Sequence, residues 1–149
     1  MGPRRKGREL AVQALYQLDV LGTESAPHTL RAFWEGSGAS EAAKAFGTEL
    51  VAGVCADRVR IDELIAAASE HWRFERLSLV DVCVLRLATF ELLQSPRVPT
   101  SVVLDEAIEI ARRFGNTESA GFVNGVLDAI AARLGVKDEP TRSGDTNER

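Results

Sequence analysis

Cysteine, aromatic residues and long apolar runs are all scarce in this chain of 149 residues. Its two cysteines, Cys55 and Cys83, lie between apolar neighbours at a spacing that fits no zinc motif, so we expect two buried thiols. No apolar run reaches the roughly 18 residues of a membrane span. The segment after the basic start is interrupted by Gln13, Gln17 and Asp19, which is unlike a secretion signal. We therefore expect one cytoplasmic, reduced domain.

The common catalytic motifs are also missing. The sequence has no G-x-G-x-x-G, no P-loop and no G-x-S-x-G, and His28 and His71 stand apart without patterned partners. Asp105, Glu106 and Glu109 form an acidic cluster, in which Asp105 and Glu109 share a helix face at i, i+4 and could serve a metal or an acid–base pair. The stronger interpretation is a solvated helix face, because acids near a helix start complement its dipole. We therefore expect no enzymatic activity, no cofactor and no metal.

Apolar residues recur with a helical period along most of the chain, and no segment shows convincing alternation with period two. The inward stripes fall within residues 11–21, 30–34, 46–54, 61–68, 79–93, 103–114 and 123–134. We therefore predict an all-α fold of about seven helices, with a break near residues 57–60 and a central helix at 79–93. Gly125 lies inside the last stripe at a cost of about 1 kcal/mol against alanine, so we expect another helix to approach it closely. Residues 137–149 lack apolar side chains and are expected to form a disordered polar tail.

Positive charge is concentrated near the N-terminus, at Arg4, Arg5, Lys6 and Arg8, although the formal net charge is −4. The planar fork of arginine suits phosphate oxygens, and short basic runs are typical of nucleic-acid contacts. A solvated N-terminus explains the cluster equally well, and the residues alone leave both readings open. The cluster precedes the first apolar stripe, so we expect the fold to survive its removal. The residues alone also leave two interpretations of Phe122, which could be a core residue or a surface on which bases stack.

Four segments resemble the NusB family of bacterial transcription antitermination factors: RRKGRELAVQALYQLD, VLRLATFEL, VPTSVVLDEAIEIARRFG and GFVNGVLDAIA. They stand in the family's order and cover residues 4–134. The resemblance implies two small packed helical bundles over residues 1–136, with a basic arm at 1–8. It implies pairing with NusE, a small-subunit ribosomal protein, and binding of boxA-type single-stranded RNA in ribosomal RNA leaders. Other Nus factors and RNA polymerase would join the assembly, and some family members form homodimers.

The resemblance also implies site residues. Those matching the family's RNA-binding positions are Arg4, Arg5, Lys6, Arg8, Glu118 and Phe122. Those matching positions associated with NusE pairing are Tyr16 and Asp81. Tyr16 could instead be a core residue, because tyrosine often belongs to a buried stripe. Lys6 stands where arginine is common and Gly121 where some relatives carry a basic residue, so we expect a weaker RNA contribution from the loop near Gly121.

Two other functions fit parts of the pattern. NusB-like domains also occur at the N-terminus of RNA cytosine methyltransferases, but this sequence shows no strand–glycine loop–helix unit for a methyl donor. A helical adaptor protein without RNA binding is the second alternative. The acidic remainder of the chain is consistent with the family resemblance, because it suits a basic ribosomal-protein partner and discourages indiscriminate RNA binding, but it does not by itself indicate this function.

Overall fold

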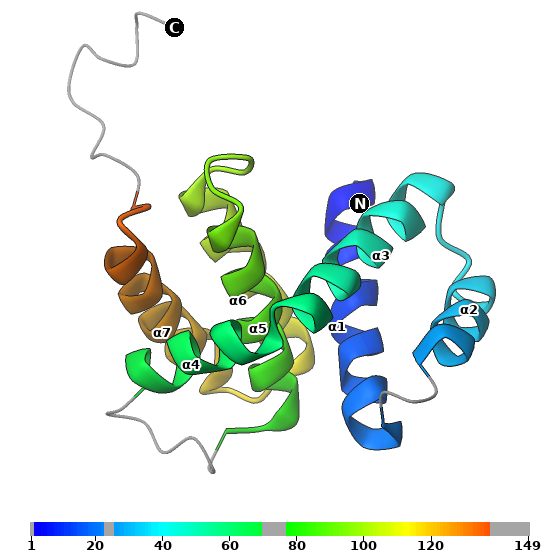
Figure 1. The fold of residues 1–149 in the computed structure, drawn as a ribbon, viewed down its shortest axis with the longest axis horizontal. Coiled ribbons are helices and arrows are strands. Elements are labelled where there is room, and N and C mark those ends of the chain that lie inside the picture. The colour runs from blue at the N-terminus through cyan, green and yellow to red at the C-terminus, as the bar shows by residue number, and fades with distance from the viewer. Residues whose placement is uncertain (1, 23–25, 70–76, 138–149) are drawn as a thin grey trace, which may run out of the picture.

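The computed structural model describes residues 2–22, 26–69 and 77–137, and its regular structure in these ranges is entirely helical (Figure 1). The helices are α1 (Pro3–Leu21), α2 (Ala26–Gly36), α3 (Glu41–Ala56), α4 (Arg58–Ala68), α5 (Leu79–Leu93), α6 (Thr100–Phe114) and α7 (Ser119–Leu134). The predicted all-α fold is confirmed, and the break expected near residues 57–60 is the α3–α4 boundary at Asp57. The tail from residue 138 onward and His71 lie outside the described residues.

Local side chains explain where several helices begin and end. Ser40 caps α3, because its Oγ accepts the N–H of Ala43 at 3.2 Å. Ser78 caps α5 in the same way, accepting the N–H of Asp81 at 3.1 Å. Gly135 ends α7 with a left-handed backbone at φ 70°, which glycine adopts without strain.

The helices form two groups, α1–α3 and α4–α7, which lie side by side in Figure 1. Helix α5 contacts α1, α3, α4, α6 and α7, as expected for a helix that is apolar almost all round. Leu15 of α1, Leu85 of α5 and Leu127 of α7 belong to one apolar cluster. The two groups therefore share a continuous core.

A partly buried charge network holds α1, α4 and α5 together. Arg86 of α5 donates from Nη1 to Asp19 Oδ2 at 2.7 Å and from Nε to Asp62 Oδ1 at 2.8 Å. Arg58 of α4 also donates to Asp19, at 3.1 Å. Burial disfavours the charged form of Arg86, but the hydrogen bonds that it donates to Asp62 and Asp19, together with the negative charges of these carboxylates, outweigh burial and raise the pKa of Arg86. The network fixes the C-terminal half of α1 against α5.

The close helix approach expected at Gly125 is wrong, and it occurs at Gly7 instead. A Cβ on Gly125 would meet no atom of the described residues within 4 Å. A Cβ on Gly7 would lie 2.9 Å from both the Ala43 carbonyl oxygen and Cδ2 of Phe46. Helix α3 therefore packs directly on the α1 backbone at Gly7.

Two burial predictions also need correction. Leu21, the last residue of the first predicted stripe, is 61% exposed, so the inward face of α1 ends at Leu18. Cys55 is exposed and only Cys83 is buried. Burial raises the pKa of the Cys83 thiol to about 12 and also raises the pKa of the Cys55 thiol.

Candidate functional site

The basic cluster forms the first two turns of α1. Pro3 begins the helix. Proline lacks a backbone N–H, and this costs nothing here because the N–H of a first helical residue has no acceptor within the helix. Arg4 is exposed, and Arg5 and Lys6 are half-buried. The guanidinium carbon of Arg4 lies 5.2 Å from the ring centroid of Phe46 on α3, within the range of a cation–π contact. A folded helix thus presents these cations.

Arg8 differs from its neighbours because it is buried. Its side chain is 3% exposed, and its Nε and Nη2 donate to the two carboxylate oxygens of Glu91 at 2.8 and 2.9 Å. Glu91 of α5 is itself only 5% exposed. The expectation that the whole cluster precedes the core is therefore wrong, since Arg8 anchors α1 to α5. The structure thus places Arg8 in the interior, away from solvent.

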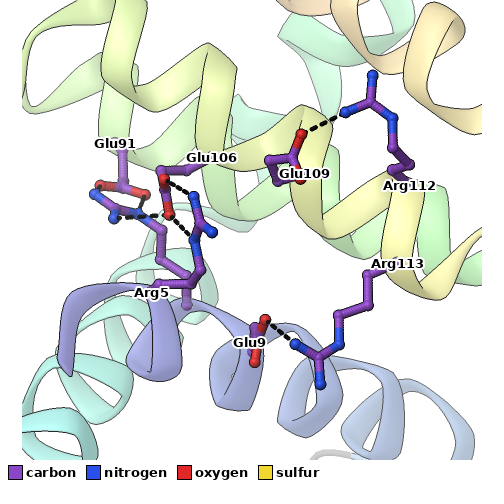
Figure 2. A network of polar contacts seen from close by, with 8 residues as sticks. Arg5, Glu9, Glu91, Glu106, Glu109, Arg112 and Arg113 are labelled. Carbon is purple, nitrogen blue, oxygen red and sulfur yellow. Dashed lines mark hydrogen bonds and ion pairs between the residues drawn. The ribbon is translucent and has the colours of Figure 1, made fainter. Parts of the chain in front are cut away.

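Arg5 makes a similar pair with Glu106 of α6, closer to solvent (Figure 2). Nε donates to Oε1 at 2.9 Å and Nη2 to Oε2 at 2.6 Å, with the Arg5 side chain 41% exposed. These hydrogen bonds raise the pKa of Arg5 and lower the pKa of Glu106. Glu106 also lies 3.8 Å from Nη1 of Arg8. Its carboxylate therefore sits between a buried and an accessible cation.

Figure 2 shows further charged residues along the contact between α1 and α6, beyond Glu106. Arg113 of α6 donates to Glu9 of α1 at 3.1 Å, and Arg112 pairs with Glu109 on its own helix. Sequence reasoning missed the partners Glu91, Glu106 and Arg113, because each lies more than 80 positions from its α1 partner. The sequence places Glu106 on a helix face expected to be solvated, and no local spacing indicates any of these three pairs.

Glu118 and Phe122 lie together at the start of α7. Glu118 is exposed, and its N–H donates to Asn116 Oδ1 at 2.8 Å. Phe122 is 5% exposed and belongs to the apolar core, so the core reading of this residue holds. The Phe122 N–H donates to the Glu118 carbonyl at 3.1 Å. Phe122 thus anchors the start of α7 in the apolar core.

A second surface of α1 is apolar and open. Tyr16 is 41% exposed and Val20 60% exposed, which settles Tyr16 as a surface residue. Tyr16 borders a hollow of about 360 Å³. The hollow is lined by Val12, Gln13, Tyr16, Gln17, Phe33, Val80 and Phe114. Val20 lies one turn after Tyr16 and was not predicted as a surface residue. The sequence does indicate it, because Tyr16 and Val20 form an i, i+4 apolar pair on the side of the helix opposite the buried stripe.

Asp81, the other residue expected at a partner surface, is 4% exposed and follows Val80 of the hollow. Its N–H donates to the capping Ser78, and its buried Oδ1 has no hydrogen-bond partner among the residues described. A carboxylate in the first turn of α5 complements the helix dipole. Asp81 is therefore buried and does not line the hollow.

Other kinds of site find no support in this part of the chain. Within residues 2–22, 26–69 and 77–137, no three His, Cys, Asp or Glu side chains gather as metal ligands would. None of the described helices is long and apolar enough to cross a bilayer.

Comparison with known proteins matches nearly the whole chain. A model of the NusB family matches residues 5–132. The transcription antitermination protein NusB of Sorangium cellulosum (strain So ce56) is 46% identical over 138 residues, covering 93% of this chain and 98% of that protein. The structure of T. maritima NusB has a TM-score of 0.75 at 38% identity, covering 89% of this chain and 92% of that one. A chain from a structure of the antitermination factors NusB and NusE in complex with dsRNA has a TM-score of 0.76 at 26% identity, covering 89% of this chain and 98% of that one.

Proposed function

Because this chain belongs to the NusB family of transcription antitermination proteins, we propose that it pairs with NusE and binds boxA-type single-stranded RNA in ribosomal RNA leaders. The pair would act with other Nus factors on RNA polymerase in the cytoplasm and suppress premature termination. Support for both partners comes from the similar fold in the structure of NusB and NusE with dsRNA. That RNA is double-stranded, so a preference for single strands is a separate part of the proposal.

The observation that carries RNA binding is the helical display of Arg4, Arg5 and Lys6 on an otherwise acidic chain. Because the helix is already folded, little ordering of the backbone is needed when phosphates bind. We assign the direct phosphate contacts to these three residues. Arg8 and Phe122 are buried and are assigned positioning roles, while the exposed Glu118 stays beside the proposed RNA path.

The proposed NusE surface is the hollow beside Tyr16. Exposed apolar groups next to a hollow are typical of a protein-binding site, since aromatic anchors supply much of the affinity of such interfaces. The negative net charge of the chain suits a basic ribosomal protein. Asp81 would act indirectly, by supporting Val80 at the start of α5.

RNA binding is tested by a variant that carries both Arg4→Ala and Arg5→Ala, leaving the buried Arg8 in place. Fluorescence anisotropy of the NusE-paired protein should show weaker binding and a salt slope flatter by about 1.4, since each single-strand phosphate contact contributes about 0.7. A boxA-like strand and a scrambled strand should lose affinity alike, because phosphate contacts do not read sequence.

The matched control removes two exposed cations elsewhere, through Arg60→Ala and Lys137→Ala. Equal RNA affinities for the two double variants would show that the cluster has no special role. A duplex of the same sequence that binds as tightly as the single strand would refute the single-strand preference.

Partner binding is tested with Tyr16→Asp, against Val59→Asp as the control. Val59 is 73% exposed on α4, so both changes place a charge on an exposed apolar site. Calorimetric titration with NusE should show a loss of about tenfold or more for Tyr16→Asp, because truncating a central anchor has effects of this size. The same NusE affinity in both variants would remove the hollow from the interface.

A further inference from the structure

Arg5 is the one cation of the proposed phosphate-contacting set for which the structure records a carboxylate partner on another helix. Both of its recorded donor atoms face Glu106, at 2.9 and 2.6 Å. A phosphodiester presents an edge of two oxygens much like that of a carboxylate, and arginine recognises either with the same fork. An RNA phosphate and Glu106 therefore need the same donors of Arg5.

Glu106 can give up Arg5 without becoming an isolated buried charge. Its side chain is 16% exposed, and Nη1 of Arg8 stays 3.8 Å from its Oε1. The Arg5 side chain, at 41% exposed, can turn toward solvent. Arg8 has no such freedom, because opening its pair would leave Glu91 charged and buried. The geometry permits exchange at Arg5 and opposes it at Arg8.

We propose that Glu106 competes with RNA phosphate for the Arg5 guanidinium and so holds down the RNA affinity of this surface. The inference rests on the proposed RNA-binding function. An RNA must break the Arg5–Glu106 pair before its phosphate is bound there. An RNA strand that contacts the protein only through its phosphate backbone therefore binds weakly. A strand that makes further contacts offsets the free-energy cost of breaking the Arg5–Glu106 pair.

The chain offers a matched pair of variants on α6. Glu106→Gln and Glu109→Gln each remove one negative charge, one helical turn apart, but Glu109 pairs with Arg112 of its own helix. Anisotropy of the NusE-paired protein with a labelled boxA-like single strand should show tighter binding by about two- to fivefold for Glu106→Gln, the size expected of one partly exposed ion pair. Glu109→Gln should change the affinity clearly less. An equal gain from both variants would reduce the effect to general electrostatics and overturn the proposal.

A second arm repeats Glu106→Gln in an Arg5→Gln background. If the two residues compete as described, the gain disappears there, because the freed cation is absent. A gain that persists without Arg5 would overturn the proposal. A different result would show that the proposed RNA-binding function is wrong. RNA affinity would then not change on Arg4→Ala and Arg5→Ala, whichever residue occupies position 106.

Discussion

Replacing Arg8 with alanine should lower the free energy of unfolding by about 3–5 kcal/mol, because it leaves the Glu91 carboxylate charged in the core. The two side chains are 3% and 5% exposed and share two hydrogen bonds of 2.8 and 2.9 Å. The guanidinium also lies 5.2 Å from the Phe46 ring centroid, a contact that alanine removes. Domains of this size are stable by only about 5–15 kcal/mol, so a large share of the stability is at stake.

Urea unfolding followed by far-ultraviolet circular dichroism measures the loss, and the melting temperature should fall by roughly 6–20 °C. Arg5→Ala is the control, because its ion pair with Glu106 is partly exposed and its removal should disturb the fold far less. Combining Arg8→Met with Glu91→Leu should restore most of the stability, since replacing both members of a buried pair removes the stranded charge.

An Arg8→Ala variant within about 0.5 kcal/mol of the original protein would refute the reasoning, since changes of that size are typical of surface positions. The pair with Glu91 would then be open in solution, and Arg8 would be free to contact RNA. The stability measurement must therefore precede any RNA assay. Otherwise a loss of RNA binding caused by a disturbed helix α1 would be attributed to a lost phosphate contact.

Gly7→Ala should lower the free energy of unfolding by about 1–3 kcal/mol through overpacking against α3, whereas Gly125→Ala should raise it by about 1 kcal/mol. The same sign for both in urea unfolding would contradict the assigned helix contact. One thiol, Cys55, should react with a disulfide reagent in the folded protein at pH 8, and Cys83 only in denaturant, because burial raises its pKa to about 12. Two fast thiols would place Cys83 near solvent. The hydrogen bond from Arg5 lowers the pKa of Glu106 from its ordinary 4.5, so the ion pair should stabilise the fold above about pH 4.5 and lose this effect as the pH falls further. The stability difference between the original protein and Glu106→Gln should shrink over that acid range, and a constant difference would argue against the pair.

The helices and the central place of α5 could be predicted because both follow from local periodicity. The burial of Arg8 was also within reach: Arg8, Ala11, Leu15 and Leu18 follow steps of three and four, so the inward stripe extends back through the arginine. Its partner could not be found this way, because Glu91 lies 83 positions away. Leu21 continues the same periodicity yet is 61% exposed, although Leu18, one turn earlier, is buried. Periodicity gives the direction of a side chain, while its burial depends on what packs there.

Helix α1 carries both proposed surfaces, and their spacing limits how the two partners can bind. Arg5 and Tyr16 are about 16 Å apart along a helix that rises 1.5 Å per residue, so RNA and NusE can occupy α1 together. The hollow beside Tyr16 adjoins a second one of about 400 Å³, which shares Gln13 and Phe33 with it and reaches Lys6. A partner that fills both hollows would meet the RNA strand at Lys6. Contact there would couple the two binding events, and the coupling must be reciprocal: if NusE tightened RNA binding, RNA would tighten NusE binding by the same factor.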